Sequence, residues 1–418
     1  MGEAVRNVWV AVAVASITVG AAYPVSAQDV TRGETVMDRP RPELDPLGVH
    51  LGGFQLFPSL SVGESYRDNI FDTQGGKQSD EITDIRPALK LQSNWSRHAL
   101  TLFSDARIDR YAEHSHEDFN DFAVGGRGRV DVVDRSHLDL GSSYNQRHED
   151  RSSPDDVRGV KPTEFTDTNV NVGGTAAFNR LTVGLNGVFD RYLFSNVQSS
   201  TGATINNQDR NRDESSVLMR VGYEVGPLRE VFVRGGYNRR SYSSKRDDNG
   251  FERSSDGYEI SVGADYDITG VTSAEVFVGY RRQSYNDVRL SNATGVGAGA
   301  KLIWNVTKLT TVTGELTREV EESTLLGASS YFATRGRLRV DHELLRNLIL
   351  HAGGLYGNDA YQGISRDDQH AEADVGAIYQ MNRYLALSGD YGYRARMSNA
   401  PGADFTENVV SIHLTARY

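Results

Sequence analysis

The feature that most constrains this chain is an alternation of apolar and polar residues with a period of two. In residues 258–268, tyrosine, isoleucine, valine and alanine occupy the even positions, whereas acidic residues, serine and glycine occupy the odd ones. Successive side chains of a β-strand point to opposite faces, so one face of this segment suits lipid and the other suits water. The same alternation recurs at residues 181–190, 217–225 and 410–418.

Segments of this kind run from Phe54 to Tyr418 and number about 18, or alternatively about 16, each long enough to cross a bilayer at a tilt. An even number of strands returns the chain to its starting side. Short turns, such as residues 179–180, alternate with longer polar loops, such as residues 150–164. We therefore predict an all-β fold for residues 54–418, a transmembrane antiparallel up-and-down β-barrel.

Two further segments are predicted before the barrel. Arg6 precedes an apolar run at residues 8–19, and the small residues at 25–27 offer a cleavage site, which is the pattern of a secretory signal peptide over residues 1–27. The apolar run is too short to span a bilayer. Residues 28–53 contain Pro40, Pro42 and Pro46, which disfavour regular pairing, so this segment is a periplasmic arm or a lumen insert.

Composition excludes several classes of function. The absence of cysteine removes disulfides, thiolate metal sites and cysteine nucleophiles. A net charge of -11 without a concentrated basic face argues against nucleic-acid binding. The histidines form no His-x-x-x-His pair and the chain has no Gly-x-Ser-x-Gly elbow. We expect neither an enzyme nor a cofactor or metal site.

Polar rows on the alternating segments supply the candidate functional residues. If the apolar faces meet lipid, the charged residues opposite them line the lumen. The predicted lumen-lining residues are Arg127, Arg129, Arg234, Glu259, Asp265, Glu315, Glu319, Arg335, Arg337, Arg339, Arg394 and Arg396. Arginine rows that face carboxylates across a pore can guide hydrated polar solutes. The alternative is structural: Glu315 and Glu319 on the preceding strand pair with the row at 335–339 and neutralise the wall.

Aromatic residues and acidic loops each have two interpretations. Rings near segment ends are typical of interfacial girdles. A sugar-stacking track is the alternative, and its inward candidates are Tyr111, Tyr192, Phe103, Phe232 and Phe277. The acidic residues 149–156 lack the spacing of a calcium loop, so we interpret them as a solvated loop tip. Divalent bridging from such a loop to lipopolysaccharide is the alternative.

Three motifs near the N-terminus carry a family resemblance: RPRPELDPLG at residues 39–48, FQLFPSLS at 54–61 and YRDNIF at 66–71. Through them the chain resembles the family called outer-membrane beta-barrel porin type 2, and the resemblance extends diffusely over the barrel. It implies a role in export of exopolysaccharide or capsule together with a periplasmic polysaccharide-export protein. The terminal Tyr418 also resembles the aromatic signature that the outer-membrane barrel assembly machinery reads.

These observations predict an exported protein of the Gram-negative outer membrane that contacts lipid and lipopolysaccharide. A barrel of about 18 strands is wide enough for an aqueous lumen, and the sequence has no nucleotide-binding loop to drive transport. The first interpretation is a passive pore that takes part in exopolysaccharide or capsule export. A general diffusion porin for small polar solutes is the alternative, and a plugged structural or surface-binding barrel is the second alternative.

Overall fold

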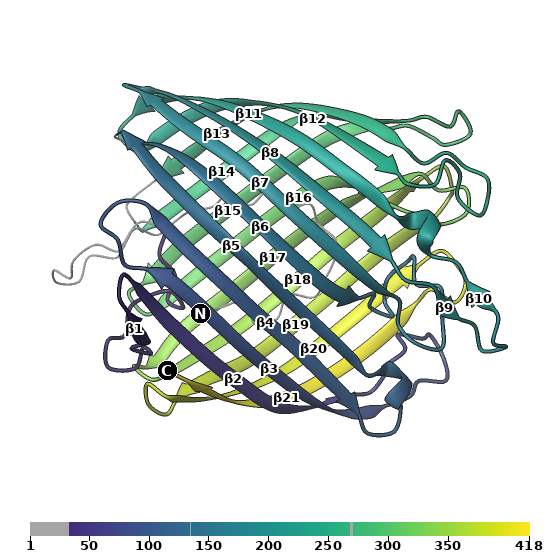
Figure 1. Cartoon of the computed structure of the whole chain (residues 1–418), viewed down its shortest axis with the longest axis horizontal. Coiled ribbons are helices and arrows are strands. Elements are labelled where there is room, and N and C mark those ends of the chain that lie inside the picture. The colour runs from purple at the N-terminus through teal and green to yellow at the C-terminus, as the bar shows by residue number, and fades with distance from the viewer. Residues whose placement is uncertain (1–32, 134, 268–270) are drawn as a thin grey trace.

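The alternating segments form a closed antiparallel β-barrel in the computed structural model, which describes residues 33–133, 135–267 and 271–418 (Figure 1). The described wall has 18 strands, as predicted, and closes where β2 pairs with β21. The predicted signal peptide, residues 1–27, lies outside the described residues. None of the helices in the described part of the chain is long and apolar enough to cross a membrane.

The first half of the chain contains the strands β1 (Val49–Leu51), β2 (Phe54–Arg67), β3 (Asp80–Ser93), β4 (Ala99–Tyr111), β5 (Phe119–Val133), β6 (Ser136–His148), β7 (Glu164–Phe178), β8 (Leu181–Phe194), β9 (Val197–Gln198) and β10 (Thr204–Ile205). Two short 3-10 helices, η1 (Ser115–Glu117) and η2 (Gln208–Arg210), interrupt its loops.

The second half contains the strands β11 (Arg212–Gly226), β12 (Arg229–Tyr242), β13 (Ser255–Asp267), β14 (Thr272–Tyr285), β15 (Ala293–Thr307), β16 (Thr310–Glu322), β17 (Ser330–Leu345), β18 (Leu348–Gln362), β19 (Asp367–Gln380), β20 (Leu385–Ser398) and β21 (Phe405–Arg417). Each wall strand pairs with its neighbour along the chain. The three short strands are not part of the wall count: β1 pairs only with the start of the wall strand β2, and β9 and β10 pair with each other.

The two ends of the barrel differ, as the predicted loop lengths imply. Short turns join β7 to β8 and β11 to β12, and Asn179 and Leu228 there have φ of 55° and 58°, the left-handed conformation that tight hairpins require. Long loops join the strands at the opposite end, which carries β9 and β10 on the right of Figure 1. β1 and the C-terminus lie at the short-turn end. Short periplasmic turns and long external loops are typical of outer-membrane barrels.

The predicted register of the faces is confirmed on β13. Ile260 and Val262 are 57% and 56% exposed, whereas Ser261 between them is 7% exposed because it faces the interior. The exposed apolar side chains meet the hydrocarbon of the bilayer, where each strand must satisfy its backbone groups through its neighbours. The prolines of residues 28–53 all precede residue 47, and Val49–Leu51 forms the short strand β1, which the sequence did not predict.

Candidate functional site in the barrel lumen

The inner wall carries all twelve predicted lumen-lining residues on faces opposite the exposed apolar side chains of the same strands. On β20, for example, Tyr391 and Met397 are exposed, whereas Arg394 and Arg396 lie on the other face. Most of the twelve make ion pairs with nearby wall residues: Arg129 with Asp131, Arg234 with Glu275, Glu259 with Arg281, Glu315 with Lys301, Arg335 with Asp359, Arg337 with Glu372 and Arg339 with Asp341.

The partners of the arginine row on β17 differ from those the sequence suggested. Glu315 is in register with Arg337, but its carboxylate lies 3.8 Å from the ammonium of Lys301 on β15. Arg337 instead lies 3.7 Å from Glu372. The reason is that long side chains lean along and across the sheet, so register alone does not choose the partner. The carboxylates that lie beside the row are therefore those of Asp359, Glu372 and Asp341, in place of the predicted Glu315 and Glu319.

The inward aromatic rings lie flat on the wall beneath arginine side chains. Phe103, Phe232 and Phe277 each lie directly across from a glycine, Gly125, Gly263 or Gly299, where a Cβ atom would meet the ring at less than 3 Å. Guanidinium groups cover them: Arg127 lies 5.4 Å from the Phe103 centroid, Arg220 lies 3.8 Å from that of Phe232, and Arg234 lies 3.6 Å from that of Phe277. Such cation–π contacts occupy the ring faces that a sugar would need.

The two remaining candidates for a sugar-stacking track, Tyr192 and Tyr111, are also inaccessible to a passenger in the lumen. Arg212 lies 4.6 Å from the centroid of Tyr192, which is 5% exposed. Tyr111 is buried in a cluster with Ile70, Ile82 and Phe119. A passenger in the lumen therefore meets guanidinium and carboxylate groups before it meets aromatic rings.

A loop that enters the lumen was not predicted. Residues 149–163 between β6 and β7, here called the constriction loop, carry the acidic stretch that we interpreted as a solvated tip. That interpretation is wrong, because Glu149, Arg151 and Asp156 have side-chain exposures of 8%, 6% and 1%. Arg151 pairs with Glu117 of η1 at 2.6 Å and lies 3.4 Å from Asp156. Burying these charges is tolerable only because they neutralise one another.

Arg394 of β20 binds the constriction loop to the wall. Its guanidinium lies 2.9 Å from Asp72 in the β2–β3 loop, 3.7 Å from Asp150 in the constriction loop and 3.3 Å from Glu407 on β21. Arg396 donates a hydrogen bond of 2.7 Å to the carbonyl of Ser152. One side chain therefore joins three carboxylates from different parts of the chain.

Burial shifts the pKa values of the carboxylates in and beside the constriction loop. It raises the pKa of Asp72 to about 7, because the loss of hydration outweighs the attraction of Arg394. Burial also raises the pKa of Asp156 to about 6, although Arg151 lies nearby. Burial acts on Asp150 in the same direction, but there Arg394 and Arg67 prevail and hold the pKa well below its usual range.

The constriction loop also contacts the end of the β16–β17 hairpin, which lies nearly opposite β6 and β7 in the strand order. The carboxylate of Asp155 accepts a hydrogen bond of 2.9 Å from the backbone N–H of Thr324. Arg253, in the β12–β13 loop, donates to the carbonyls of Ser323 and Ala328 at 2.7 and 3.0 Å. The loops thus meet across the lumen at the long-loop end.

At the short-turn end the residues 33–48, here called the N-terminal insert, lie against inward-facing wall residues. The buried backbone N–H of Val36 donates to Thr311 of β16 at 2.9 Å. Arg41 is 2% exposed and pairs with Glu343 of β17 at 2.8 Å. Arg417 of β21 donates to the carbonyl of Leu44 at 3.1 Å. The insert therefore covers the part of the mouth that lies between β16 and β21.

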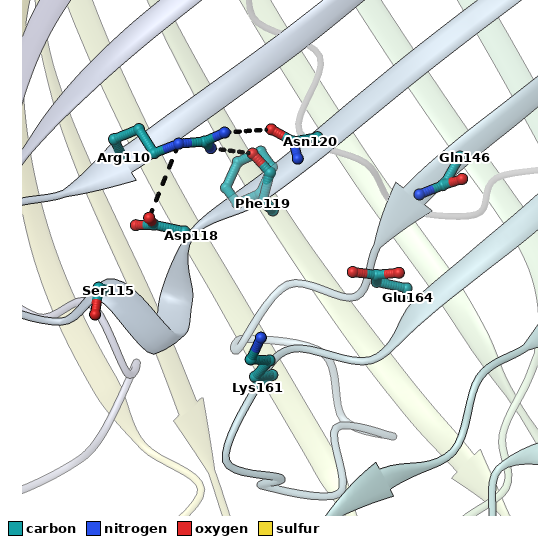
Figure 2. Close-up of a pocket in the computed structure, with 8 residues that line it drawn as sticks. All are labelled: Arg110, Ser115, Asp118, Phe119, Asn120, Gln146, Lys161 and Glu164. Atoms are coloured by element: carbon teal, nitrogen blue, oxygen red, sulfur yellow. Dashed lines mark hydrogen bonds and ion pairs between the residues drawn. The ribbon is translucent and has the colours of Figure 1, made fainter.

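A polar pocket of 340 Å³ lies on the outer side of the long-loop rim (Figure 2). Arg110, Asn120, Gln146 and Glu164 share the outward face of β4–β7, and the ammonium of Lys161 lies beside Glu164 in Figure 2. Arg110 donates to Asn120 at 2.7 Å. Its position at the rim sets this pocket among lipid headgroups rather than in the lumen. The part of the chain that the structure describes contains no group of three or more residues suited to hold a metal ion.

The terminal Tyr418 follows β21 and is 47% exposed, on the same outward face as Leu414. Its backbone N–H donates to the carbonyl of Pro58 on β2, and its ring stacks on Tyr384 at 5.8 Å between centroids. The hydrogen bond to Pro58 continues the pairing of the last strand with the first wall strand. Reading of this residue by the assembly machinery stays a prediction.

Solved structures with a similar fold include outer-membrane barrels of Pseudomonas aeruginosa. A mutant of the ferric enterobactin receptor PfeA is 6% identical, with 87% of this chain and 80% of that chain covered and a TM-score of 0.48. The outer-membrane protein OpdK is 10% identical, with 87% and 99% covered and a TM-score of 0.46. OpdO is 14% identical, with 87% and 96% covered and a TM-score of 0.45.

No curated protein sequence matches the chain significantly. The model of one protein family does match, over residues 41–418, which is nearly the whole described barrel and includes most of the N-terminal insert. Its description agrees with the resemblance of the N-terminal motifs and with the closed barrel seen here. The chain belongs to the family described as "Putative beta-barrel porin 2", the porin-like barrels of the Gram-negative outer membrane.

Proposed function

We propose that this porin is a passive channel for hydrated, hydroxyl-rich passengers, and that it takes part in export of exopolysaccharide or capsule. The observation that carries the proposal is the inner wall, where guanidinium and carboxylate groups alternate and cover the aromatic rings. Such groups exchange hydrogen bonds readily with water and hydroxyls, so a polar chain can slide past them without a deep binding site. Polysaccharide as the passenger rests on the family resemblance. The proposal assigns the barrel no catalytic reaction.

The partners in this proposal follow the asymmetry of the barrel. A periplasmic polysaccharide-export protein would act at the short-turn end, where the N-terminal insert covers part of the mouth. Lipopolysaccharide would contact the outward pocket at the opposite rim, whose Arg110 and Lys161 suit phosphates and whose carboxylates suit bridging cations. The assembly machinery would read Tyr418 before the barrel closes.

Conductance in planar bilayers tests the channel. The wild type should give stable open steps, and a variant with residues 152–160 replaced by a short Gly-Ser linker should give larger ones, because the constriction loop narrows the lumen. A matched variant that shortens residues 199–204, at the β9–β10 hairpin, should leave the steps unchanged. If neither the wild type nor the loop-shortened variant conducts ions at any voltage, the proposed channel function is refuted.

Passage of polysaccharide has its own test. Dextran added on the short-turn side of an open channel should cause transient current blocks whose duration grows with chain length, whereas an apolar polymer of equal size should not enter. A diffusion porin for small polar solutes would pass short sugars and exclude the polymer without blocks, which distinguishes that alternative.

A plugged structural barrel is the second candidate, and a specific observation favours it. Both ends of the lumen hold an inserted segment that buries charged side chains, Arg41 at one end and Arg151 at the other. If only the loop-shortened variant conducts, the wild type is a gated channel; if the insert must also be removed, the barrel is plugged at rest.

A further inference from the structure

The hydrogen-bonded ladder between β15 and β16 ends before either strand does. β15 stays paired with β14 as far as Ala293, and β16 stays paired with β17 as far as Glu322. The last β15–β16 pair toward the long-loop end is Ala298 with Arg318. Beyond this pair, in the described wall, no ladder joins residues 293–297 of β15 to residues 319–322 of β16. We call this junction the seam.

At the seam, the end of the β16–β17 hairpin lies inside the wall and overlaps β15. Val320 and Phe332 lie on the faces whose other members, Leu316 and Leu338, are exposed to lipid, yet they are only 7% and 3% exposed. The ring of Phe332 covers Gly295, where a Cβ atom would lie 2.8 Å from the ring. Face-to-face contact therefore replaces backbone pairing here.

Polar side chains hold the overlapping layer from within. The carboxylate of Glu322 accepts hydrogen bonds from Tyr242 of β12 and Tyr285 of β14, at 2.9 and 3.0 Å, and pairs with Arg240. All three of these donors come from the inner wall of strands that precede the seam. A residue on the nominally outer face of β16 thus binds the inside of the barrel.

A single arginine closes the outer edge of the seam. Arg318 donates from Nε to the carbonyl of Val296 at 3.2 Å, and its guanidinium lies 4.8 Å from the centroid of Phe332. A flexible side chain here takes the place of a strand partner for the β15 edge, which is costly to leave unpaired in a membrane.

The seam begins at the level of the outer aromatic girdle. Val296 pairs with Tyr280, and the ring of Tyr280 lies 6.1 Å from that of Tyr258 on the next strand. Outward tyrosines near strand ends mark the boundary between acyl chains and headgroups. The seam therefore faces the outer leaflet on one side and the polar lumen on the other.

We propose that the seam is a lateral passage through which an amphiphile, with a polar head and an acyl chain, moves between the lumen and the outer leaflet. The charged inner wall accommodates the head, and the opened seam lets the acyl chain reach lipid without crossing polar surface. Because Asp155 holds Thr324 at the hairpin end, the constriction loop and the seam move together. The inference rests on the proposed channel function, since the polar part must travel through the lumen.

The test follows the access of a lipid probe to the inside of the seam. The chain has no cysteine, so Val320→Cys introduces a unique thiol behind β15. The barrel is placed in vesicles that contain a lysophospholipid whose headgroup carries a maleimide, and the labelling rate is measured. Adding Gly295→Ala pushes a methyl group into the Phe332 ring and should raise the rate about tenfold. Gly184→Ala, whose nearest neighbours lie 4.0 Å away, is the matched control.

A disulfide lock provides the complementary arm. Ser329 donates to the carbonyl of Ser291 at 2.6 Å, so Ser291→Cys with Ser329→Cys should fasten the hairpin end to the β14–β15 loop. Oxidation should abolish labelling of the thiol at position 320, and reduction should restore it. Ser61→Cys with Thr415→Cys, whose hydroxyl oxygens lie 3.0 Å apart on the continuous β2–β21 ladder, should have no effect.

Labelling that is equally fast in the locked and unlocked barrels, or that stays absent with Gly295→Ala while a Val296→Cys control on the lipid face is labelled, would overturn the lateral passage. Arg318→Gln, which removes the outer closure without adding volume, covers the case in which Gly295→Ala fails to fold. The assay needs no ion current. A barrel that is labelled but never conducts would therefore refute the channel and retain the seam. A barrel that conducts but is never labelled would retain the channel and refute the seam.

Discussion

The N-terminal insert and the constriction loop occupy opposite ends of the lumen, but they are held by different forces. The insert contributes mainly backbone groups, such as Val36 N–H and Leu44 carbonyl, with Arg41 as its buried ion pair. The loop contributes charges, with Arg151 and Asp150 inside networks of opposite sign. Backbone groups do not titrate, so their hydrogen bonds respond little to pH, whereas clustered charges respond to both pH and salt. The loop end is therefore the better place for a gate.

Arg394→Ala should have the largest effect on this comparison, because it leaves Asp72, Asp150 and Glu407 without their shared cation. Breaking such a buried cluster costs about 3–5 kcal/mol, which should undock the constriction loop. We expect larger conductance steps and rapid protease cleavage within residues 149–163. Arg191→Ala, which removes only an exposed pair with Asp213, should change neither.

Arg41→Ala should have a smaller effect, confined to the opposite end. It removes the buried pair with Glu343, but Arg346 lies 3.6 Å from the same carboxylate and compensates part of the loss. We expect a cost of about 3 kcal/mol, the low end for a buried pair, and faster cleavage of the N-terminal insert. Protection of the constriction loop should not change. Coupled loss of protection at both ends would show that the two segments are one cooperative unit.

The wall could be predicted from the sequence because its signal is local. Alternation places Val262 outside and Ser261 inside, and the same parity puts Arg394 in the lumen without knowledge of any other strand. The constriction loop could not be predicted, because its contacts join residues far apart in the sequence. Arg396 and Ser152 are 244 residues apart, and Glu149 is 61 residues from Arg210 of η2, with which it pairs at 2.7 Å. A polar loop that is solvated and one that is buried by compensating charges have the same composition. The mixed signs within residues 149–158 are the one signal that points toward burial.

The seam could not be predicted for a related reason. Val320 continues the alternation of β16 and therefore reads as lipid-facing, as Leu316 is. Whether a strand stays in the wall or slips behind its neighbour depends on contacts such as Phe332 with Gly295, which no single strand pattern encodes.

The next effect is pH dependence, which should differ in sign between the two ends. When the constriction loop is docked, the pKa of Asp72, in the adjoining β2–β3 loop, is about 7, and the pKa of Asp156, in the constriction loop, is about 6. The docked loop therefore binds more protons than a solvated loop between about pH 4 and pH 7, and docking weakens as the pH rises through that window. Asp150 has a lowered pKa and stays charged throughout this window, so it does not contribute to the pH dependence of docking.

At the other end, the hydrogen bond from Arg346 lowers the pKa of Glu43, so its contribution is present above the ordinary carboxyl pKa and is lost as the pH falls through the lowered value. Conductance should consequently rise between about pH 4 and about pH 7 as the constriction loop loosens, while the N-terminal insert keeps its protease resistance. Asp72→Asn, which stays neutral at every pH, should flatten the rise. A rise that persists unchanged in Asp72→Asn would assign the titration to another group.

The smallest effect concerns the arginine row between the two ends, where Arg337 is 49% exposed and lies 3.7 Å from Glu372. Its neighbours Arg335 and Arg339 hold Asp359 and Asp341 at about hydrogen-bond distance, so replacing them would disturb the wall as well as its charge. Arg337→Gln alone removes the most accessible positive charge of the row and should leave folding nearly unchanged. Because exposed charges are screened within about 10 Å at 0.1 M salt, permeability should shift toward cations mainly in dilute electrolyte. Reversal potentials across a salt gradient measure this shift. An unchanged reversal potential with intact conductance would show that the row is only a structural part of the wall. Charge selection would then lie at the constriction loop, and Arg394→Ala would have to change the reversal potential.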